Sequence, residues 1–217
     1  LIPYLRHRGI RHVDMVINSH PDTDHLQGIE RVVEKFSVDY VAVPKLLKDS
    51  ERYNTLYRLT QNKRIQWLFL QGGQQINIEP GVKIKVLYPA IEKQTDDNVN
   101  NLSAVIKVDY KQFSLLMPGD IEQDGIKRLI ADKDMATIVI FKVPHHGSRY
   151  SLVPEFYQLI KPRFAVISVG NNNFGHPSSD VITVLKDQGT IVYRTDLDGA
   201  VTFISDGYKL QVKNYKI

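Results

Sequence analysis

The chain has 217 residues, of which 42% are hydrophobic and 24% are charged, and its formal net charge is +4 with a pI near 9.1. These values are ordinary for a globular protein with a sizeable core, and so small a basic excess is compatible with a polyanionic partner without requiring one. The absence of cysteine excludes disulfides, thiolate zinc sites and cysteine nucleophiles, so any metal must be held by nitrogen and oxygen atoms.

The first half of the chain predicts helices that alternate with strands. Hydrophobic residues at helical spacing from Ile29 to Phe36 indicate an amphipathic helix over residues 26–36. Further helices are expected over residues 1–9 and 46–64, strands over residues 13–18, 38–44, 65–70 and 82–89, and a polar loop over residues 95–103.

The second half adds a hairpin to this alternation. Residues 103–110 and 113–120 form two short hydrophobic runs around Lys111 and Gln112, a spacing typical of paired antiparallel strands. We therefore expect a mixed α/β fold, in one domain over residues 1–217, whose sheets are not purely parallel. The other expected elements are helices over residues 122–131, 151–160 and 179–188, and strands over residues 136–144, 164–170, 190–195, 200–205 and 208–214.

Metal-ligand chemistry is concentrated in HPDTDH, residues 20–25, between a predicted strand and a predicted helix. Two imidazoles and two carboxylates this close together are costly to bury without a cation. His20 and Asp22 are two residues apart in extended backbone, so their side chains point the same way. Asp24 and His25 begin the helix, where both can face back toward the end of the strand. This pattern indicates a loop that can hold two cations.

Three later segments also carry His or Asp where a predicted strand ends. They contain Asp120 in MPGD, His145 and His146 in HHGS, and His176 in GHPSS. Strand ends at one edge of a sheet lie close together in space, so we expect these side chains to meet HPDTDH. Two alternatives stay open, because either histidine of HHGS can face the metals and His176 can be an ordinary loop residue beside a helix capped by Ser178.

The order of these motifs resembles a known family. HPDTDH is similar to the His-x-His-x-Asp-His signature of the metallo-β-lactamase fold, with Asp22 where the second histidine usually stands. The blocks NNLSAVIKVDY, SLLMPGDIE, KVPHHGS, AVISVGNNNFGHPSS and VYRTDLDGAV resemble more specifically the carboxy-terminal domain of the ComEC family, which forms the DNA-import channel of natural transformation. The resemblance covers nearly the whole chain. It implies a metallo-β-lactamase-like αββα sandwich that lacks its first strands, as a fragment of a longer membrane protein.

The resemblance also implies roles for individual residues. Two divalent ions, Mn²⁺ or Zn²⁺, would polarise a phosphodiester and activate water, and His145 or His176 would protonate the leaving oxygen. The implied metal ligands are His20, Asp22, Asp24, His25, Asp120 and His146, with His145 as the rival of His146. Asp24, His145 and His176 are the expected catalytic residues, and Asn101, Ser148 and Arg194 the expected substrate-binding residues. Tyr150 is expected to be partly buried, with stacking on a base as the alternative.

The implied activity is a metal-dependent phosphodiesterase or nuclease that degrades the non-imported DNA strand. The alternatives are a hydrolase of another phosphodiester, such as a wall-linked choline ester, and a non-catalytic module that guides DNA. Expected partners are DNA, the membrane channel of the parent chain and the DNA-uptake machinery, with no small organic cofactor. No hydrophobic run approaches the roughly 20 residues of a membrane-spanning helix, so we expect a soluble domain. The resemblance implies that this domain lies on the extracytoplasmic side of a bacterial plasma membrane.

Overall fold

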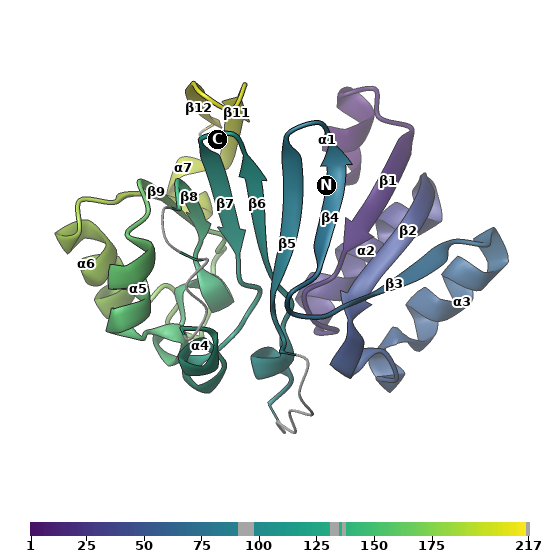
Figure 1. The fold of residues 1–217 in the computed structure, drawn as a ribbon, viewed down its shortest axis with the longest axis horizontal. Coiled ribbons are helices and arrows are strands. Elements are labelled where there is room, and N and C mark those ends of the chain that lie inside the picture. Colours follow the sequence, from purple (N-terminus) through teal and green to yellow (C-terminus); the bar gives the residue numbers. More distant parts are fainter. Residues whose placement is uncertain (91–97, 131–134, 136–137, 216–217) are drawn as a thin grey trace.

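Two β-sheets face each other, and helices cover the outer side of each sheet (Figure 1). The computed structural model describes residues 1–90, 98–130, 135 and 138–215. One sheet has the strand order β1-β2-β3, and the other has the order β10-β9-β8-β7-β6-β5-β4. The strands β11 and β12 form a separate hairpin. The predicted mixed α/β architecture is therefore confirmed.

The smaller sheet is parallel and is built from the first third of the chain. Strand β1 pairs with β2, which pairs with β3, and each return passes through a helical connection on the outer side of the sheet (Figure 1). The elements are α1 (Ile2–His7), β1 (His12–Ile17), α2 (Thr23–Lys35), β2 (Ser37–Pro44), α3 (Asn54–Lys63) and β3 (Gln66–Leu70).

The larger sheet changes from antiparallel to parallel pairing at β7. Strands β7 to β10 are all parallel, so their carboxyl ends share one edge, and Figure 1 shows β1 ending on the same side as β7. The elements are β4 (Gln75–Glu79), β5 (Val82–Tyr88), β6 (Val105–Tyr110), β7 (Phe113–Met117), α4 (Gln123–Leu129), β8 (Ile140–Lys142), α5 (Pro154–Ile160), β9 (Phe164–Ile167), α6 (Ser179–Asp187), β10 (Ile191–Arg194), α7 (Thr195–Asp198), β11 (Ala200–Ser205) and β12 (Leu210–Tyr215).

The core has three layers: one between the two sheets and one between each sheet and its helices. Successive side chains of a strand point to opposite faces of the sheet and so belong to different layers. In β2, Val41 and Val43 pack against α2 and α3, whereas Ala42 faces the space between the sheets. In β6, Val105 packs toward α4 and α5, whereas Ile106 joins Ala42 between the sheets. Each sheet is thus hydrophobic on both faces, as a sandwich with helices outside both sheets requires.

Several predicted boundaries change in the structure. The predicted helix over residues 46–64 is two short 3₁₀ turns, Lys45–Leu47 and Glu51–Tyr53, followed by α3. Strand β4 and helix α7 were missed, because four or five residues carry too little periodicity to be recognised. Parts of the predicted loop 95–103, helix 122–131 and strand 136–144 lie outside the described residues. Within the part that is described, no helix combines the length and hydrophobicity needed to cross a membrane.

A core substitution tests the packing between β8 and α5. Phe141 is fully buried, and its ring lies 5.7 Å from the rings of Phe156 and Tyr157. Phe141→Ala should lower the free energy of unfolding by about 3–5 kcal/mol, because the lost contacts leave a cavity. The matched control Leu197→Ala alters an exposed side chain and should change stability by less than about 0.5 kcal/mol. Equal effects in a denaturant titration would contradict this packing.

Candidate metal centre

The loop after β1 carries His20 and leads to Asp24 and His25 in the first turn of α2. The hydroxyl oxygen of Ser19 lies 3.0 Å from Nδ1 of His20 and 3.3 Å from Nδ1 of His25. This shared contact sets the two rings with their centroids 4.3 Å apart. Both Nε2 atoms stay free of hydrogen bonds to the described protein atoms, although they are buried. The loop therefore holds two imidazoles ready to bind a cation.

Asp120 reaches this loop from the carboxyl end of β7. The preceding Gly119 has a φ of +63°, and a Cβ there would lie 2.8 Å from the Cβ of Ser19 and 2.9 Å from that of Ser103. A glycine is required because only a residue without a side chain allows this approach. The amide of Asp120 donates to Oγ of Ser103 at 3.3 Å, and its Oδ2 lies 3.2 Å from Nε2 of His25.

The turn after β8 decides which of the paired histidines faces the cluster. His145 and His146 both have left-handed backbone conformations, with φ of 46° and 53°. Nδ1 of His146 donates to the carbonyl of Ser168 at 2.6 Å, which leaves Nε2 as an acceptor. That Nε2 lies 3.2 Å from Oδ2 of Asp24 and 3.5 Å from Oδ2 of Asp120. An imidazole nitrogen and two carboxylate oxygens this close together are stabilised by a proton or a metal cation between them.

The assembled donor set fits a divalent cation. Ligand atoms of Asp24, His25, Asp120 and His146 all lie within 4.8 Å of one another. Oδ1 of Asp120 is buried without a hydrogen-bond partner among the described residues, as is Nε2 of His20. Unpaired buried polar atoms are costly, and mixed imidazole and carboxylate ligands suit zinc or manganese.

Burial and neighbouring charges shift two pKa values in this cluster. Burial and the imidazole of His25 lower the pKa of His20 to about 4, although Asp120 and Asp22 act in the opposite direction. Burial alone would raise the pKa of Asp120, but His25, Lys142 and His146 outweigh it and hold the pKa of this carboxyl well below its usual range. At neutral pH the centre thus presents a neutral imidazole and an ionised carboxylate, the forms that bind metals.

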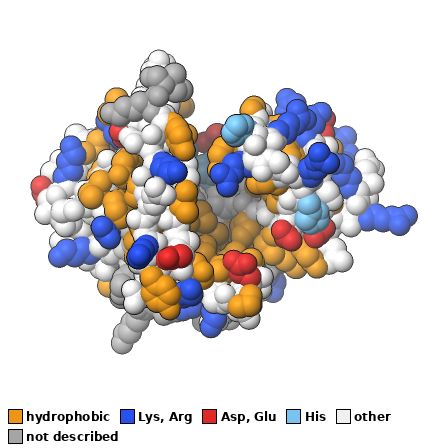
Figure 2. All heavy atoms as spheres, turned by 90° about the horizontal axis from the view of Figure 1, so that it is seen from above, with side chains coloured by type: hydrophobic (Ala, Val, Ile, Leu, Met, Phe, Trp, Pro, Cys, Tyr) orange, Lys and Arg blue, Asp and Glu red, His pale blue; other side chains and the backbone are white. Residues whose placement is uncertain are grey.

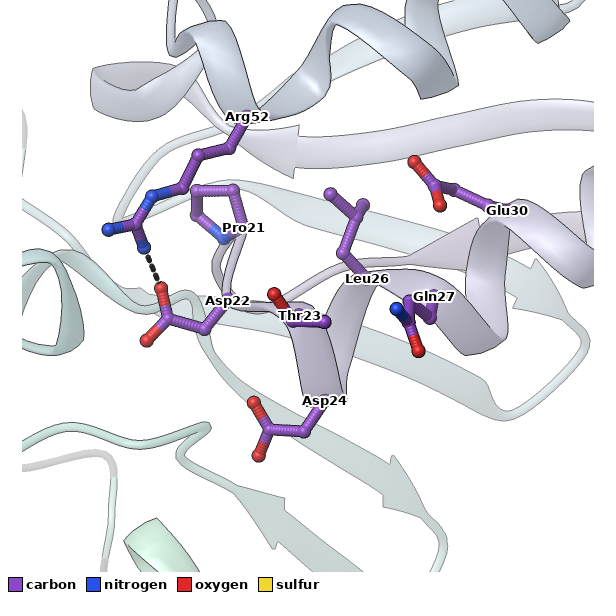
Figure 3. Close-up of a pocket in the computed structure, with 8 residues that line it drawn as sticks. All are labelled: Pro21, Asp22, Thr23, Asp24, Leu26, Gln27, Glu30 and Arg52. Carbon is purple, nitrogen blue, oxygen red and sulfur yellow. Dashed lines mark hydrogen bonds and ion pairs between the residues drawn. The ribbon is translucent and has the colours of Figure 1, made fainter.

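Asp22 lies apart from the four-residue cluster. It caps α2, and its carboxylate pairs with Arg52 across a pocket of about 630 Å³ (Figure 3). Its other oxygen lies 3.8 Å from Nε2 of His20. Figure 3 shows Asp24 pointing away from Arg52. Arg52 was missed by the sequence reasoning, because it lies 30 residues away and no motif includes it.

His145 and His176 border the cluster without joining it. Their ring centroids lie 5.4 Å apart, and the rings of His145 and His146 lie 6.3 Å apart. Nδ1 of His145 lies 3.2 Å from Oε1 of Glu122. Glu122 was also missed, although it follows Asp120 by two residues. His145 therefore lies between His146 and His176, at the margin of the cluster.

Two of the expected substrate-binding residues, Asn101 and Ser148, accept hydrogen bonds from backbone amides of their own surroundings. Oδ1 of Asn101 accepts the amides of Glu122 and Gly125 at 3.1 Å each, at the start of α4. Both lone pairs of that oxygen are used, so it is not available as a ligand. Ser148 is fully buried and its hydroxyl accepts the amide of Tyr150 at 3.2 Å. This buried hydroxyl supports the turn, and its expected contact with a phosphate stays a prediction.

The other two surface expectations also change. The guanidinium of Arg194 is held by both carboxylate oxygens of Asp196, at 3.1 and 2.5 Å, and the hydrogen bonds to this carboxylate raise the pKa of Arg194. Its charge is therefore already compensated, which weakens the expected phosphate contact. Tyr150 is 58% exposed, so the expectation that it is partly buried was wrong. It is the middle residue of a 3₁₀ turn, Arg149–Ser151, and does not begin an α-helix.

A hydrophobic cavity of about 390 Å³ lies between the sheets and reaches the cluster at His25. Ile84, Ile106 and Met117 line it, and Lys142 lies at the end next to the cluster. Figure 2 looks into the opening between the sheets and shows the hollow bordered by hydrophobic side chains, with Lys and Arg around its rim. The metal ligands therefore have a hydrophobic wall on this side, which strengthens the electrostatic interactions among them.

Comparison with known proteins supports the resemblance inferred from the motifs. ComE operon protein 3 of Bacillus subtilis is 28% identical over 100% of this chain, and competence protein ComA of Neisseria gonorrhoeae is 28% identical over 94% of it. Recombination protein 2 of Haemophilus influenzae is 27% identical over 97% of the chain. The chain spans about a quarter of the length of these relatives, 27%, 27% and 25%. The predicted resemblance to ComEC proteins is confirmed. No family model matches the chain.

Solved structures show the fold. Igni18, a metallo hydrolase from Ignicoccus hospitalis, superposes with a TM-score of 0.56 over 94% of this chain and 80% of that protein, at 14% identity. Zn²⁺-bound PqqB from Methylobacterium extorquens superposes with a TM-score of 0.53 over 85% of this chain and 72% of that protein, at 11% identity. The predicted metallo-β-lactamase-like sandwich is confirmed.

The shifted pKa of His20 predicts a pH dependence of the metal-free protein. Its pKa is about 4 in the folded protein and 6.5 for an unperturbed histidine, so the unfolded chain binds more protons than the folded protein between these pH values. Stability is then complete above about pH 6.5 and is lost as the pH falls toward about 4, by at most about 3 kcal/mol. Denaturant titrations of chelator-treated protein from pH 7 to 4 should show this slope. His20→Gln should flatten it, and an unchanged slope would refute the assignment.

A metal titration tests the four-residue cluster. Asp120→Asn should weaken or abolish high-affinity binding of Mn²⁺ or Zn²⁺ measured by calorimetry. The reason is that the side chain of residue 120, whose Oδ2 lies close to Nε2 of both His25 and His146, loses its negative charge. The matched control is Asp14→Asn in the exposed group of His12, Asp14 and Asp39, which should leave metal content unchanged. Equal metal content in Asp120→Asn and the parent protein would rule the cluster out.

Proposed function

We propose that this chain is a metal-dependent phosphodiesterase that cleaves DNA during natural transformation and degrades the strand that is not imported. The observation that carries the proposal is the convergence of Asp24, His25, Asp120 and His146 within 4.8 Å. The names of the relatives, competence and recombination proteins, support DNA as the substrate, and the net charge of +4 suits a polyanion. The wider setting that we propose is a parent membrane channel with this domain on its extracytoplasmic side.

The residues of the chain have separable tasks in this proposal. Asp24, His25, Asp120 and His146 would hold one divalent ion, and His20 and Asp22 would contribute ligands for a second. The ions would supply Lewis-acid polarisation of the phosphodiester and activation of water. Ser19 and the carbonyl of Ser168 position the imidazoles by binding their Nδ1 atoms, as outer hydrogen bonds do in metal sites.

Proton delivery to the leaving oxygen falls to the two histidines beside the cluster. Glu122 lies 3.2 Å from Nδ1 of His145 and can orient that ring, as a carboxylate orients a general acid. His176 lies 5.4 Å from the same ring, measured between centroids. Both are therefore placed to exchange a proton with an oxygen that leaves from the cluster.

Metal reloading tests the activity itself. Chelator-treated protein should bind a fluorescent oligonucleotide without cutting it, and addition of Mn²⁺ or Zn²⁺ should restore cleavage. Binding without cleavage under Mn²⁺, Zn²⁺ and Mg²⁺ would instead favour a module that only guides DNA. Faster turnover of small phosphodiesters than of oligonucleotides in direct competition would indicate another substrate.

Leaving-group dependence tests the proton donors. His145→Gln and His176→Gln should slow oligonucleotide cleavage by roughly 10²–10⁴-fold. The same variants should hydrolyse bis(4-nitrophenyl) phosphate nearly normally, because nitrophenolate leaves without protonation. His7→Gln is the matched control, since this histidine is exposed on α1. Equal losses on both substrates would mean that the two histidines support the metal or the fold and do not donate the proton.

A further inference from the structure

The loop after β9 presents a highly exposed aromatic side chain next to the candidate metal centre. Phe174 is 81% exposed, the largest value among the large hydrophobic residues that the structure describes. Burying such a side chain stabilises the folded state by about 1.5–3 kcal/mol. The exposed ring of Phe174 does not contribute this free energy. Scattered exposed hydrophobic residues are common, so exposure alone does not indicate a binding role for Phe174. The hydrogen bonds of its loop and the neighbouring side chains are more specific.

One side chain fixes the backbone on both sides of Phe174. Oδ1 of Asn172 accepts the amides of Phe174 and His176 at 3.0 and 3.1 Å. Nδ2 of Asn172 donates to the carbonyls of Gly170 and His176 at 3.0 and 2.8 Å. All four hydrogen bonds that this amide can form are made with residues 170–176. The loop is thus braced with its aromatic side chain pointing outward.

The ends of the loop are anchored to neighbouring elements. The hydroxyl of Thr195 exchanges hydrogen bonds of 2.7 Å with the amide and carbonyl of Val169. The amide of Ser178 donates to the carbonyl of Gly147 at 2.8 Å. A loop that is already ordered loses little entropy when a ligand binds. This favours a binding role for Phe174 over the exposure of a loosely held tip.

A row of rings connects Phe174 to the metal ligands. Its ring is stacked on that of His176, with centroids 6.0 Å apart and an angle of 27° between the planes. His176 lies 5.4 Å from His145, which lies 6.3 Å from His146. A planar group resting on the open face of Phe174 would therefore lie two histidine rings away from His146, which lines one pocket together with Phe174 and His176.

Phe174 separates two pockets of a size suited to small planar ligands. One has a volume of about 350 Å³ and includes Val169 and Thr195, and the other has about 360 Å³ and includes Arg149 and Tyr150. Binding sites for small molecules usually have volumes of about 300–1,000 Å³. Each pocket can therefore hold one nucleobase against the phenyl ring.

The pocket on the Tyr150 side also carries an available positive charge. The guanidinium of Arg149 lies over the ring of Tyr150, 5.7 Å from its centroid. Arg149 has no carboxylate within ion-pair distance among the described residues, in contrast to Arg194. Asp180 also lines this pocket, and its carboxylate would repel a phosphate, so the anion would have to bind on the side of the pocket next to Arg149. An aromatic surface beside an uncompensated guanidinium matches a base and its phosphate.

We propose that Phe174 is the stacking surface for a nucleobase next to the scissile phosphodiester, and that Arg149 binds a neighbouring phosphate. A base inside a duplex is covered on both faces, so this subsite selects single-stranded nucleic acid, or a base displaced from its stack. This inference rests on the proposed phosphodiesterase function and gives that same site its substrate class.

Binding measured without cleavage separates the subsite from catalysis. Fluorescence anisotropy in EDTA would compare a single-stranded oligonucleotide with an abasic strand of equal length and charge. Phe174→Ala should weaken binding of the oligonucleotide by roughly 5- to 100-fold and leave binding of the abasic strand unchanged. Phe174→Trp should retain binding. Arg149→Gln should weaken binding of both strands and reduce the dependence of log K on log salt by about one.

Controls keep each outcome informative. Tyr208→Ala, which removes another exposed aromatic ring from the turn between β11 and β12, should bind both strands like the parent protein. Thermal melting should be unchanged in Phe174→Ala, because the ring is exposed. Unaltered oligonucleotide binding by Phe174→Ala, or an equal loss for the abasic strand, overturns the stacking role. Lack of cleavage by the metal-loaded parent protein refutes the nuclease function alone, since the anisotropy experiment does not depend on turnover.

Discussion

The close approach of two carboxylates and two imidazoles, from Asp24, His25, Asp120 and His146, is the constraint on which the rest of the structure depends. Three elements in different parts of the chain must meet to produce it: the start of α2, the end of β7 and the turn after β8. The sandwich satisfies this requirement because β1 in one sheet and β7 and β8 in the other end on the same side. Hydrophobic layers on both faces of each sheet hold the strands in that arrangement. The stability of the core is therefore what opposes the mutual repulsion of the crowded acids.

Local backbone geometry completes the approach. Gly119 allows the loop after β7 to touch Ser19, and Gly147 allows the turn after β8 to pack against Pro177, whose Cβ would lie 2.6 Å from a Cβ at that glycine. His145 and His146 adopt left-handed conformations between these contacts. Such conformations cost about 1–3 kcal/mol each for residues with side chains. These conformations occur at the point where the imidazole of His146 faces the cluster.

Around this centre, residues that stand close to the ligands in the sequence motifs have different structural roles. Asn101 and Ser148 support the ends of a helix and a turn, while Arg52 holds Asp22 at the margin of the cluster. The exposed loop that carries Phe174 is braced by Asn172 and contributes no side chain to the cluster of metal ligands. Ligand binding, proton transfer and contact with a polymer can thus be altered one at a time.

The sequence by itself determined the kinds of ligand and their positions at the ends of predicted strands. Hydrophobic period and the order HPDTDH, MPGD, HHGS are local properties of the chain, and local periodicity indicates where a strand ends and a helix begins. It also determined the hairpin of β6 and β7, whose turn lies at the predicted residues.

Only the tertiary structure decided how the individual side chains are used. His146 faces the cluster because the carbonyl of Ser168, 22 residues away, accepts its Nδ1 proton. Asn101 supports the start of α4 because the amides of Glu122 and Gly125, more than 20 residues away, donate to its side chain. Each outcome depends on contacts between segments distant in the chain, and such contacts exist only when the two sheets have packed against each other.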